Sequence, residues 1–224
     1  MRIDLPPCIL FDLDGTLIDS LPGIEFSVQK ALSTCGFPLA TRSLRELIGP
    51  PIRTILSRAG NVPEGAALDA VEREFRVSYD DEGWHKSSCY PQAEAVLQMM
   101  RERGHRLFVV TNKPRQSALP ILKKAGILQY FETVVARDSG SFPQCTKEKM
   151  IGTLLVERSI VRDQCVVIGD TLEDATAAAR AGIRFILMTH GYGNPRQIPP
   201  SYIWHTMNNF SEFLHLIMKE TVLD

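Results

Sequence analysis

The stretch Cys8-Ile-Leu-Phe-Asp12-Leu-Asp14-Gly-Thr16 joins a short apolar run to two closely spaced carboxylates. The run Cys8–Phe11 contains no polar side chain, which is the pattern of a strand buried on both faces in a parallel sheet. One aspartate after such a strand would fit a helix cap or an Asx turn. Two carboxylates in one tight turn repel each other, so the pair indicates a site that uses a cation or substrate chemistry.

From about residue 92 to residue 190, apolar runs alternate with segments of helical pattern. The spacing predicts strands at 106–110, 131–136, 165–168 and 185–188. Alternating strands and helices with uniformly apolar strands are typical of a parallel sheet covered by helices on both faces. We therefore expect an α/β fold with a three-layer Rossmannoid core.

Residues 20–82 carry no strand pattern and show helical periodicity instead. Leu68, Val71, Phe75 and Tyr79, for example, fall on one helical face. A helical block placed directly after the first strand of an α/β core indicates an insertion. We expect an α/β core formed by residues 1–20 and 88–224, and an all-helical cap formed by residues 21–87.

The composition excludes several classes of protein. Of 224 residues, 25 are Lys or Arg and 26 are Asp or Glu, which leaves a formal net charge of −1 with 44% hydrophobic residues. This is an ordinary globular composition, and it offers no basic field for nucleic acid. No apolar run approaches the ~20 residues of a membrane span, and no export signal is visible. We expect a cytoplasmic monomer or homodimer with no nucleic-acid or membrane partner.

The segment Asp12-Leu-Asp14-Gly-Thr16 resembles the first motif of the haloacid dehalogenase superfamily, Asp-x-Asp-Gly-Thr. The resemblance extends over essentially the whole chain. It implies that Asp12 is a nucleophile that attacks phosphorus and that Asp14 is the general acid and base. Dehalogenases and phosphonatases of this superfamily lack an aspartate at the position of Asp14, so its presence indicates phosphoryl transfer.

Two further motifs follow in the order that the resemblance requires. Thr111-Asn112 comes after a predicted strand and resembles the second motif, which implies that both residues bind phosphate. Lys147 resembles the lysine of the third motif, which binds phosphate and fixes the nucleophile. Lys149 remains an alternative for that role, because the Lys-Pro-x-Pro pattern of many relatives is absent.

The fourth motif is an apolar strand that ends in Gly169-Asp170. The resemblance implies that Asp170 binds Mg²⁺ together with Asp12 and the backbone carbonyl of Asp14, and two ligating aspartates suffice for this ion. Asp174 would support the site from behind, or would only place a favourable charge in the first turn of a helix.

Two segments outside these motifs resemble phosphoglycolate phosphatase-like members of the superfamily. The first, residues 45–53, ends at Arg53, a candidate for holding a substrate anion because a guanidinium can bind a carboxylate or phosphate through two donors. A solvated surface arginine is the competing interpretation. The second segment, residues 190–195, is expected to form a loop at the rim of the site.

Together these features predict a Mg²⁺-dependent phosphatase. Its substrate would be a small phosphorylated metabolite, such as a phosphoglycolate-like compound or a sugar phosphate, and its intermediate an aspartyl-phosphate. A phosphomutase of the same superfamily is the first alternative, and a non-catalytic phosphate-binding regulator is the second. A dinucleotide-dependent dehydrogenase is not expected, because no G-x-G-x-x-G follows the first strand.

Overall fold

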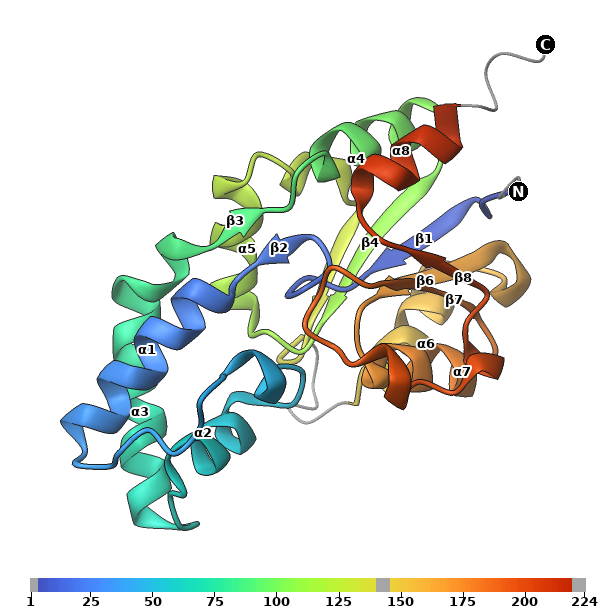
Figure 1. Cartoon of the computed structure of the whole chain (residues 1–224). Coiled ribbons are helices and arrows are strands. Elements are labelled where there is room, and N and C mark those ends of the chain that lie inside the picture. Colours follow the sequence, from blue (N-terminus) through green and yellow to red (C-terminus); the bar gives the residue numbers. More distant parts are fainter. Residues whose placement is uncertain (1–3, 140–145, 219–224) are drawn as a thin grey trace. The chain divides into compact units, whose positions relative to one another are not determined.

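The computed structural model describes residues 4–139 and 146–218 of the chain (Figure 1). The chain divides into two compact units: Met1–Ile18 together with Cys89–Asp224, and Asp19–Ser88. Among the described residues, no helix combines the length and apolar character needed to cross a membrane.

A six-stranded parallel sheet forms the centre of the first unit. Its strands are β1 (Cys8–Phe11), β4 (Arg106–Thr111), β5 (Thr133–Ala136), β6 (Cys165–Gly169), β7 (Arg184–Met188) and β8 (His205–Met207). They lie in the order β5-β4-β1-β6-β7-β8, and each pairing is parallel. The first apolar run of the sequence is therefore an inner strand, flanked by β4 and β6, which explains its freedom from polar residues.

Helices cover both faces of this sheet, so the predicted three-layer α/β core is confirmed. Helices α6 (Lys147–Glu157) and α7 (Leu172–Ala181) pack on one face, over a core that includes Leu10, Phe108 and Phe185. Helices α4 (Ala93–Glu102) and α8 (Phe210–Met218) contact each other on the opposite face (Figure 1). Strands added on either side of β1 by right-handed crossovers place their helices on opposite faces.

The remaining elements of this unit are shorter or lie at its edge. Helix α5 (Arg115–Lys124) packs against the edge strand β5. Single 3₁₀ turns are η3 (Leu128–Tyr130), η4 (Arg162–Gln164), η5 (Pro195–Gln197) and η6 (Pro200–Tyr202). Strand β8 was not expected from the sequence, because three residues with two polar side chains carry too little periodicity. It pairs with β7 alone and is therefore an edge strand, which does not need the continuous apolar sequence of an inner strand.

The second unit is built from helices. It contains α1 (Leu21–Thr34), η1 (Arg45–Leu47), α2 (Ile52–Gly60), α3 (Ala66–Asp81) and η2 (Gly83–Lys86). Its core is formed by one face of each long helix and includes Val28, Leu32, Leu56, Val71 and Phe75. Residues Arg45–Leu47 form only one 3₁₀ turn, because Gly49-Pro50-Pro51 follows it and a proline disfavours helix in the residue before it.

A two-stranded sheet lies where the chain passes between the two units. It pairs β2 (Ile18–Asp19) with β3 (Ser88–Cys89). Each strand has only two residues, so neither could be predicted from hydrophobic periodicity. The segments at which the chain enters and leaves residues 19–88 are therefore paired with each other.

Candidate active site

The candidate site lies at the carboxyl ends of three adjacent inner strands, β4, β1 and β6. In the sheet register, Phe11 lies opposite both Val109 and Ile168. Parallel pairing therefore brings Thr111, the last residue of β4, to the same edge as Asp12 and Asp170, which follow β1 and β6. This edge is where ligands bind in open parallel sheets.

Three carboxylates meet at this edge. One oxygen of each of Asp12, Asp170 and Asp174 lies within 4.8 Å of the others. The three residues are only 6%, 1% and 0% exposed, respectively. Carboxylates this close and this buried repel one another strongly, so cationic groups must share the space.

Lys147 supplies one cationic group. Its Nζ donates to Oδ1 of Asp12 at 2.6 Å and to Oδ1 of Asp174 at 2.5 Å. Lys147 is the first residue of α6 and is itself buried, whereas Lys149, two residues further on, is exposed. Of the two lysines that the sequence left open, the structure brings Lys147 to the carboxylates.

Asp174 lies in the first turn of a helix and also contacts the candidate site through Lys147, so it combines the two roles that the sequence suggested for it. It lies in the first turn of α7, where its Oδ2 accepts hydrogen bonds from the backbone nitrogen of Thr171 at 3.0 Å and from the Thr171 hydroxyl at 2.6 Å. The Thr171 side chain accepts in turn from the Asp174 backbone, which completes a capping box. Helix capping therefore orients the carboxylate that holds Lys147.

The second carboxylate of the first motif has a separate partner. Nζ of Lys113 donates to the two carboxylate oxygens of Asp14 at 3.0 and 3.2 Å. Lys113 is 9% exposed, while the Asp14 side chain is 20% exposed. The sequence analysis assigned no role to Lys113, although it directly follows Thr111-Asn112.

Thr111 is buried at the end of β4, and its hydroxyl accepts a hydrogen bond from the backbone nitrogen of Lys113 at 3.1 Å. Asn112, between the two, is half-buried. The turn after β4 is thus closed by the Thr111 side chain. It presents Thr111 at the edge that Asp12 occupies and directs the Lys113 side chain to Asp14.

Asp170 is held by donors from two segments far apart in the chain. Its Oδ1 accepts from the Thr16 hydroxyl at 3.1 Å. Its Oδ2 accepts from the backbone nitrogens of Tyr192 and Gly193 at 2.7 and 3.3 Å. The loop that the sequence placed at the rim of the site therefore contacts Asp170 through its backbone. Side-chain patterns carry no signal for such contacts.

The turn after β1 also depends on close packing. Gly15 has φ +86°, a conformation that L-amino acids with side chains rarely adopt, and a Cβ there would clash with the Asp170 carboxylate. The glycine of the first motif therefore allows the turn to approach Asp170.

Burial dominates the electrostatics of the cluster. Burial raises the pKa of Asp12 well above its usual range, and this effect exceeds the opposing attraction of Lys147. Burial and the neighbouring Asp174 raise the pKa of Asp170 to about 7. Burial alone would lower the pKa of Lys147, but Asp12 and Asp174 outweigh it and raise that pKa. Two of the three buried carboxylates, Asp12 and Asp174, therefore share one charged ammonium. A further cation beside the cluster would favour the ionised forms of its carboxylates.

Comparison with known proteins agrees with this geometry. Residues 9–188 match the family model of the haloacid dehalogenase-like hydrolases. The chain belongs to that family.

Curated relatives of this hydrolase include the plasmid-encoded phosphoglycolate phosphatase of Cupriavidus necator, which is 36% identical over 84% of each chain. The phosphoglycolate phosphatase of Rhodobacter capsulatus is 34% identical over 84% of this chain and 86% of its own. Among solved structures, a predicted phosphoglycolate phosphatase from Haemophilus somnus superimposes with a TM-score of 0.82 at 27% identity, covering 94% of this chain and 97% of its own. The hydrolase is thus an enzyme similar to phosphatases.

Arg53 lies in the helical unit of the hydrolase, where three carboxylates surround its guanidinium. It contacts Asp69 at 2.7 Å, Glu64 at 2.9 Å and Glu72 at 3.2 Å. Hydrogen bonds from these side chains, Asp69 first, raise the pKa of Arg53. The structure therefore pairs Arg53 with acidic neighbours of its own unit, and its contact with a substrate anion stays a prediction.

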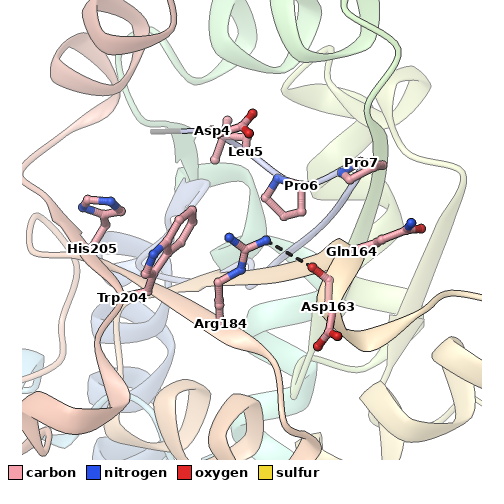
Figure 2. Close-up of a pocket in the computed structure, with 9 residues that line it drawn as sticks. All are labelled: Asp4, Leu5, Pro6, Pro7, Asp163, Gln164, Arg184, Trp204 and His205. Carbon is pink, nitrogen blue, oxygen red and sulfur yellow. Dashed lines mark hydrogen bonds between the residues drawn. The ribbon is translucent and has the colours of Figure 1, made fainter. Parts of the chain in front are cut away.

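A pocket of about 670 Å³ lies in the first unit of the hydrolase, at the amino ends of its strands (Figure 2). Figure 2 shows Arg184 beside Trp204, and the Arg184 guanidinium lies 4.3 Å from the centre of a Trp204 ring. None of the nine lining residues belongs to the predicted site. The pocket is therefore separate from the carboxylate cluster, which lies where the strands end.

Proposed function

We propose that the hydrolase is a Mg²⁺-dependent phosphatase that acts on a small phosphorylated metabolite through an aspartyl-phosphate. Its substrate would be phosphoglycolate-like, a sugar phosphate or a similar monoester, consistent with the phosphoglycolate phosphatases among its relatives. The observation that carries the proposal is that the two carboxylates have different cationic partners. Asp12 is hydrogen-bonded to Lys147 within the buried cluster, while Asp14 is hydrogen-bonded to Lys113. One can then act as nucleophile and the other as acid and base.

The residues of the cluster fit Mg²⁺. The family resemblance assigns the ion to Asp12, Asp170 and the Asp14 backbone carbonyl, and Asp174 supports this set by holding Lys147 with one oxygen and Thr171 with the other. Mg²⁺ is bound through one or two carboxylates, waters and substrate phosphate, which matches this donor set. When bound, the ion would neutralise charge on Asp12 and on the phosphoryl oxygens, so that one anion could attack another.

In the first step of the proposed reaction, an Asp12 oxygen forms a bond to phosphorus as the bond to the leaving oxygen breaks. Asp14 gives its proton to that leaving oxygen. Lys147 holds the Asp12 carboxylate in place and partly neutralises the negative charge of the phosphoryl group. Thr111 and Asn112 would bind the phosphoryl oxygens. The products of this step are the free alcohol and the aspartyl-phosphate.

In the second step, a water oxygen attacks phosphorus and Asp14 takes its proton. The bond between phosphorus and Asp12 breaks, which releases inorganic phosphate and restores the Asp12 carboxylate. Lys113 would stay hydrogen-bonded to Asp14 in both steps and would keep this carboxyl group directed toward the space in which both proton transfers occur. Phosphate monoesters hydrolyse so slowly without a catalyst that these effects must act together.

The helical unit is assigned the role of a cap, residues 21–87, that excludes water and reads the remainder of the substrate. Its candidate reading residue is Arg53. For this role a substrate carboxylate or second phosphate would have to compete with Asp69, Glu64 and Glu72 for the guanidinium.

A phosphate-release screen tests the proposal. The panel includes phosphoglycolate, hexose phosphates, nucleotides, pyrophosphate and p-nitrophenyl phosphate, each with Mg²⁺ and with excess chelator. We expect release that requires Mg²⁺ and is fastest with one small monoester. Release unaffected by chelator would contradict the metal requirement. A lag that a sugar bisphosphate abolishes would identify a mutase instead.

A further inference from the structure

His190 lies in the loop after β7 and connects it to the turn after β1. Its Nε2 lies 3.0 Å from the backbone oxygen of Thr16, 174 positions away in the sequence. A carbonyl oxygen only accepts hydrogen bonds, so Nε2 carries the proton and donates it. The imidazole is therefore a cross-link between two segments that both belong to the first unit.

Aromatic neighbours fix the orientation of this ring. The centre of the Tyr90 ring lies 4.1 Å from that of His190, and the centre of the Phe210 ring lies 5.6 Å from it. His190 is half-buried and contacts both of these rings. Because the ring is packed, its Nε2–H stays directed at Thr16 without the full entropic cost that a mobile side chain would incur on forming the bond.

Both segments that His190 joins also hold Asp170. On one side, the Thr16 hydroxyl donates to Oδ1 of Asp170. On the other side, the backbone nitrogens of Tyr192 and Gly193 donate to Oδ2 of Asp170. His190, Thr16, Asp170 and the 191–193 loop thus form a closed ring of contacts around one carboxylate.

The loop is packed against Asp170 with no spare space. A Cβ at Gly191 would clash with the Asp170 carboxylate, and a Cβ at Gly193 would clash with the Asp170 backbone oxygen. A small shift of this loop would therefore move the carboxylate or break its hydrogen bonds. Close packing of this kind transmits displacement rather than absorbing it.

We propose that His190 is a positioning residue for Asp170. By tying the Thr16 carbonyl to the loop, it keeps the Thr16 hydroxyl and the two loop amides converged on the carboxylate. The consequence for function rests on the proposed role of Asp170 as a Mg²⁺ ligand. Residues that orient metal ligands without contacting the metal typically contribute 10- to 100-fold to metal affinity. Loss of the His190 donor should therefore weaken metal binding by about this factor.

The test compares three substitutions. His190→Phe keeps an aromatic ring beside Tyr90 but removes the donor. His190→Gln places an amide nitrogen near the position of Nε2 and restores the donor. His205→Phe is the matched control, because His205 lies at the amino end of β8, in the pocket of Figure 2.

The first readout is amide hydrogen exchange in the metal-free protein. In His190→Phe we expect faster exchange at Tyr192 and Gly193, while His190→Gln and His205→Phe retain the protection of the parent. The second readout is the affinity for Mn²⁺, measured directly from the electron paramagnetic resonance signal of the ion. Here we expect about 10- to 100-fold weaker binding in His190→Phe and recovery to within about threefold in His190→Gln.

Kinetics provide the third readout. At saturating Mg²⁺ the KM for the phosphate ester should change little, while a Mg²⁺ titration should show that half-maximal activation needs more Mg²⁺. Unchanged exchange at Tyr192 and Gly193 in folded His190→Phe would overturn the positioning role. Full-strength Mn²⁺ binding by Asp170→Asn would instead overturn the metal role of Asp170, without affecting the exchange result. If His190→Phe does not fold, His190→Asn replaces it. Its amide is too short to reach Thr16, so it should lose the protection that His190→Gln retains.

Discussion

Nζ of Lys147 lies 2.6 Å from Oδ1 of Asp12, although 135 positions separate the two residues in the sequence. The contact joins the end of the inner strand β1 to the first turn of α6. It is buried, with 5% and 8% of the respective side chains exposed, so neither charge is screened by water. This pair is the centre of the candidate site, and the first two predictions concern it.

Asp12→Asn should reduce phosphate release by at least about 10³-fold, because an amide cannot form the acyl-phosphate bond that the proposal requires. Single-turnover assays with Mg²⁺ measure the loss, and thermal unfolding checks that the fold persists. Asp163→Asn, in the exposed turn η4, is the matched control and should keep parental activity. Activity retained in Asp12→Asn would remove Asp12 from the role of nucleophile.

Lys147→Met should lower the free energy of unfolding by about 3 kcal/mol and abolish activity, because it leaves Asp12 and Asp174 buried without their shared cation. Urea denaturation without Mg²⁺ measures the change in stability. Lys149→Met provides the comparison within the same helix, since Lys149 is exposed and should tolerate the change. Equal effects of the two substitutions would contradict the assignment of Lys147.

Mg²⁺ should stabilise the parent protein, by about 2.7 kcal/mol at 100 times its Kd, and chelator should reverse the effect. Asp170→Asn should lose this response. Without metal, we expect this variant to be at least as stable as the parent above pH 7, because burial raises the pKa of Asp170 to about 7 and so disfavours its charge. Thermal unfolding with and without Mg²⁺ measures both effects. An undiminished Mg²⁺ response in Asp170→Asn would place the ion elsewhere.

Glu132 provides a pH-dependent contribution away from the site. Arg106 donates three hydrogen bonds to its carboxylate at 3.0 to 3.2 Å, and these lower the pKa of Glu132 below its usual 4.5. A lowered pKa means that the pair stabilises the fold above about pH 4.5 and that this contribution is lost as the pH falls through the lowered value. Glu132→Gln should therefore cost about 0.2–1 kcal/mol at neutral pH and nothing in strong acid. Urea denaturation across pH measures the difference, and a constant difference would contradict this account.

Arg53→Ala tests the candidate substrate contact in the helical unit. If Arg53 binds a remote anionic group, KM should rise more for the preferred metabolite than for p-nitrophenyl phosphate, which lacks such a group. Arg58→Ala, in the same helix, is the control. Equal changes in KM for both esters would leave Arg53 only its ion pairs with Asp69, Glu64 and Glu72, whose loss would show as lower stability.

Much of the fold was predictable because the strands that form the core are short, continuous and apolar. Helix α6 begins at Lys147 for a local reason, because the Thr146 side chain caps it. The strands β2, β3 and β8 were missed, since two or three residues carry no usable period. The same limit applies to the 3₁₀ turn η1, whose extent is set by the prolines that follow it.

The sequence by itself determined the α/β class, the helical character of residues 20–82 and the positions of the carboxylates after the strands, because periodicity, turn residues and acidic motifs are local properties of a chain. Tertiary structure alone decided which charges meet. It pairs Asp12 with Lys147 rather than with Lys149, and it pairs Asp14 with Lys113. It also brings the backbone of the 191–193 loop into hydrogen-bonding contact with Asp170. Those contacts join residues that lie 22 to 135 positions apart, so they depend on sheet register and helix packing. Their strength depends on burial, which no local stretch of residues specifies.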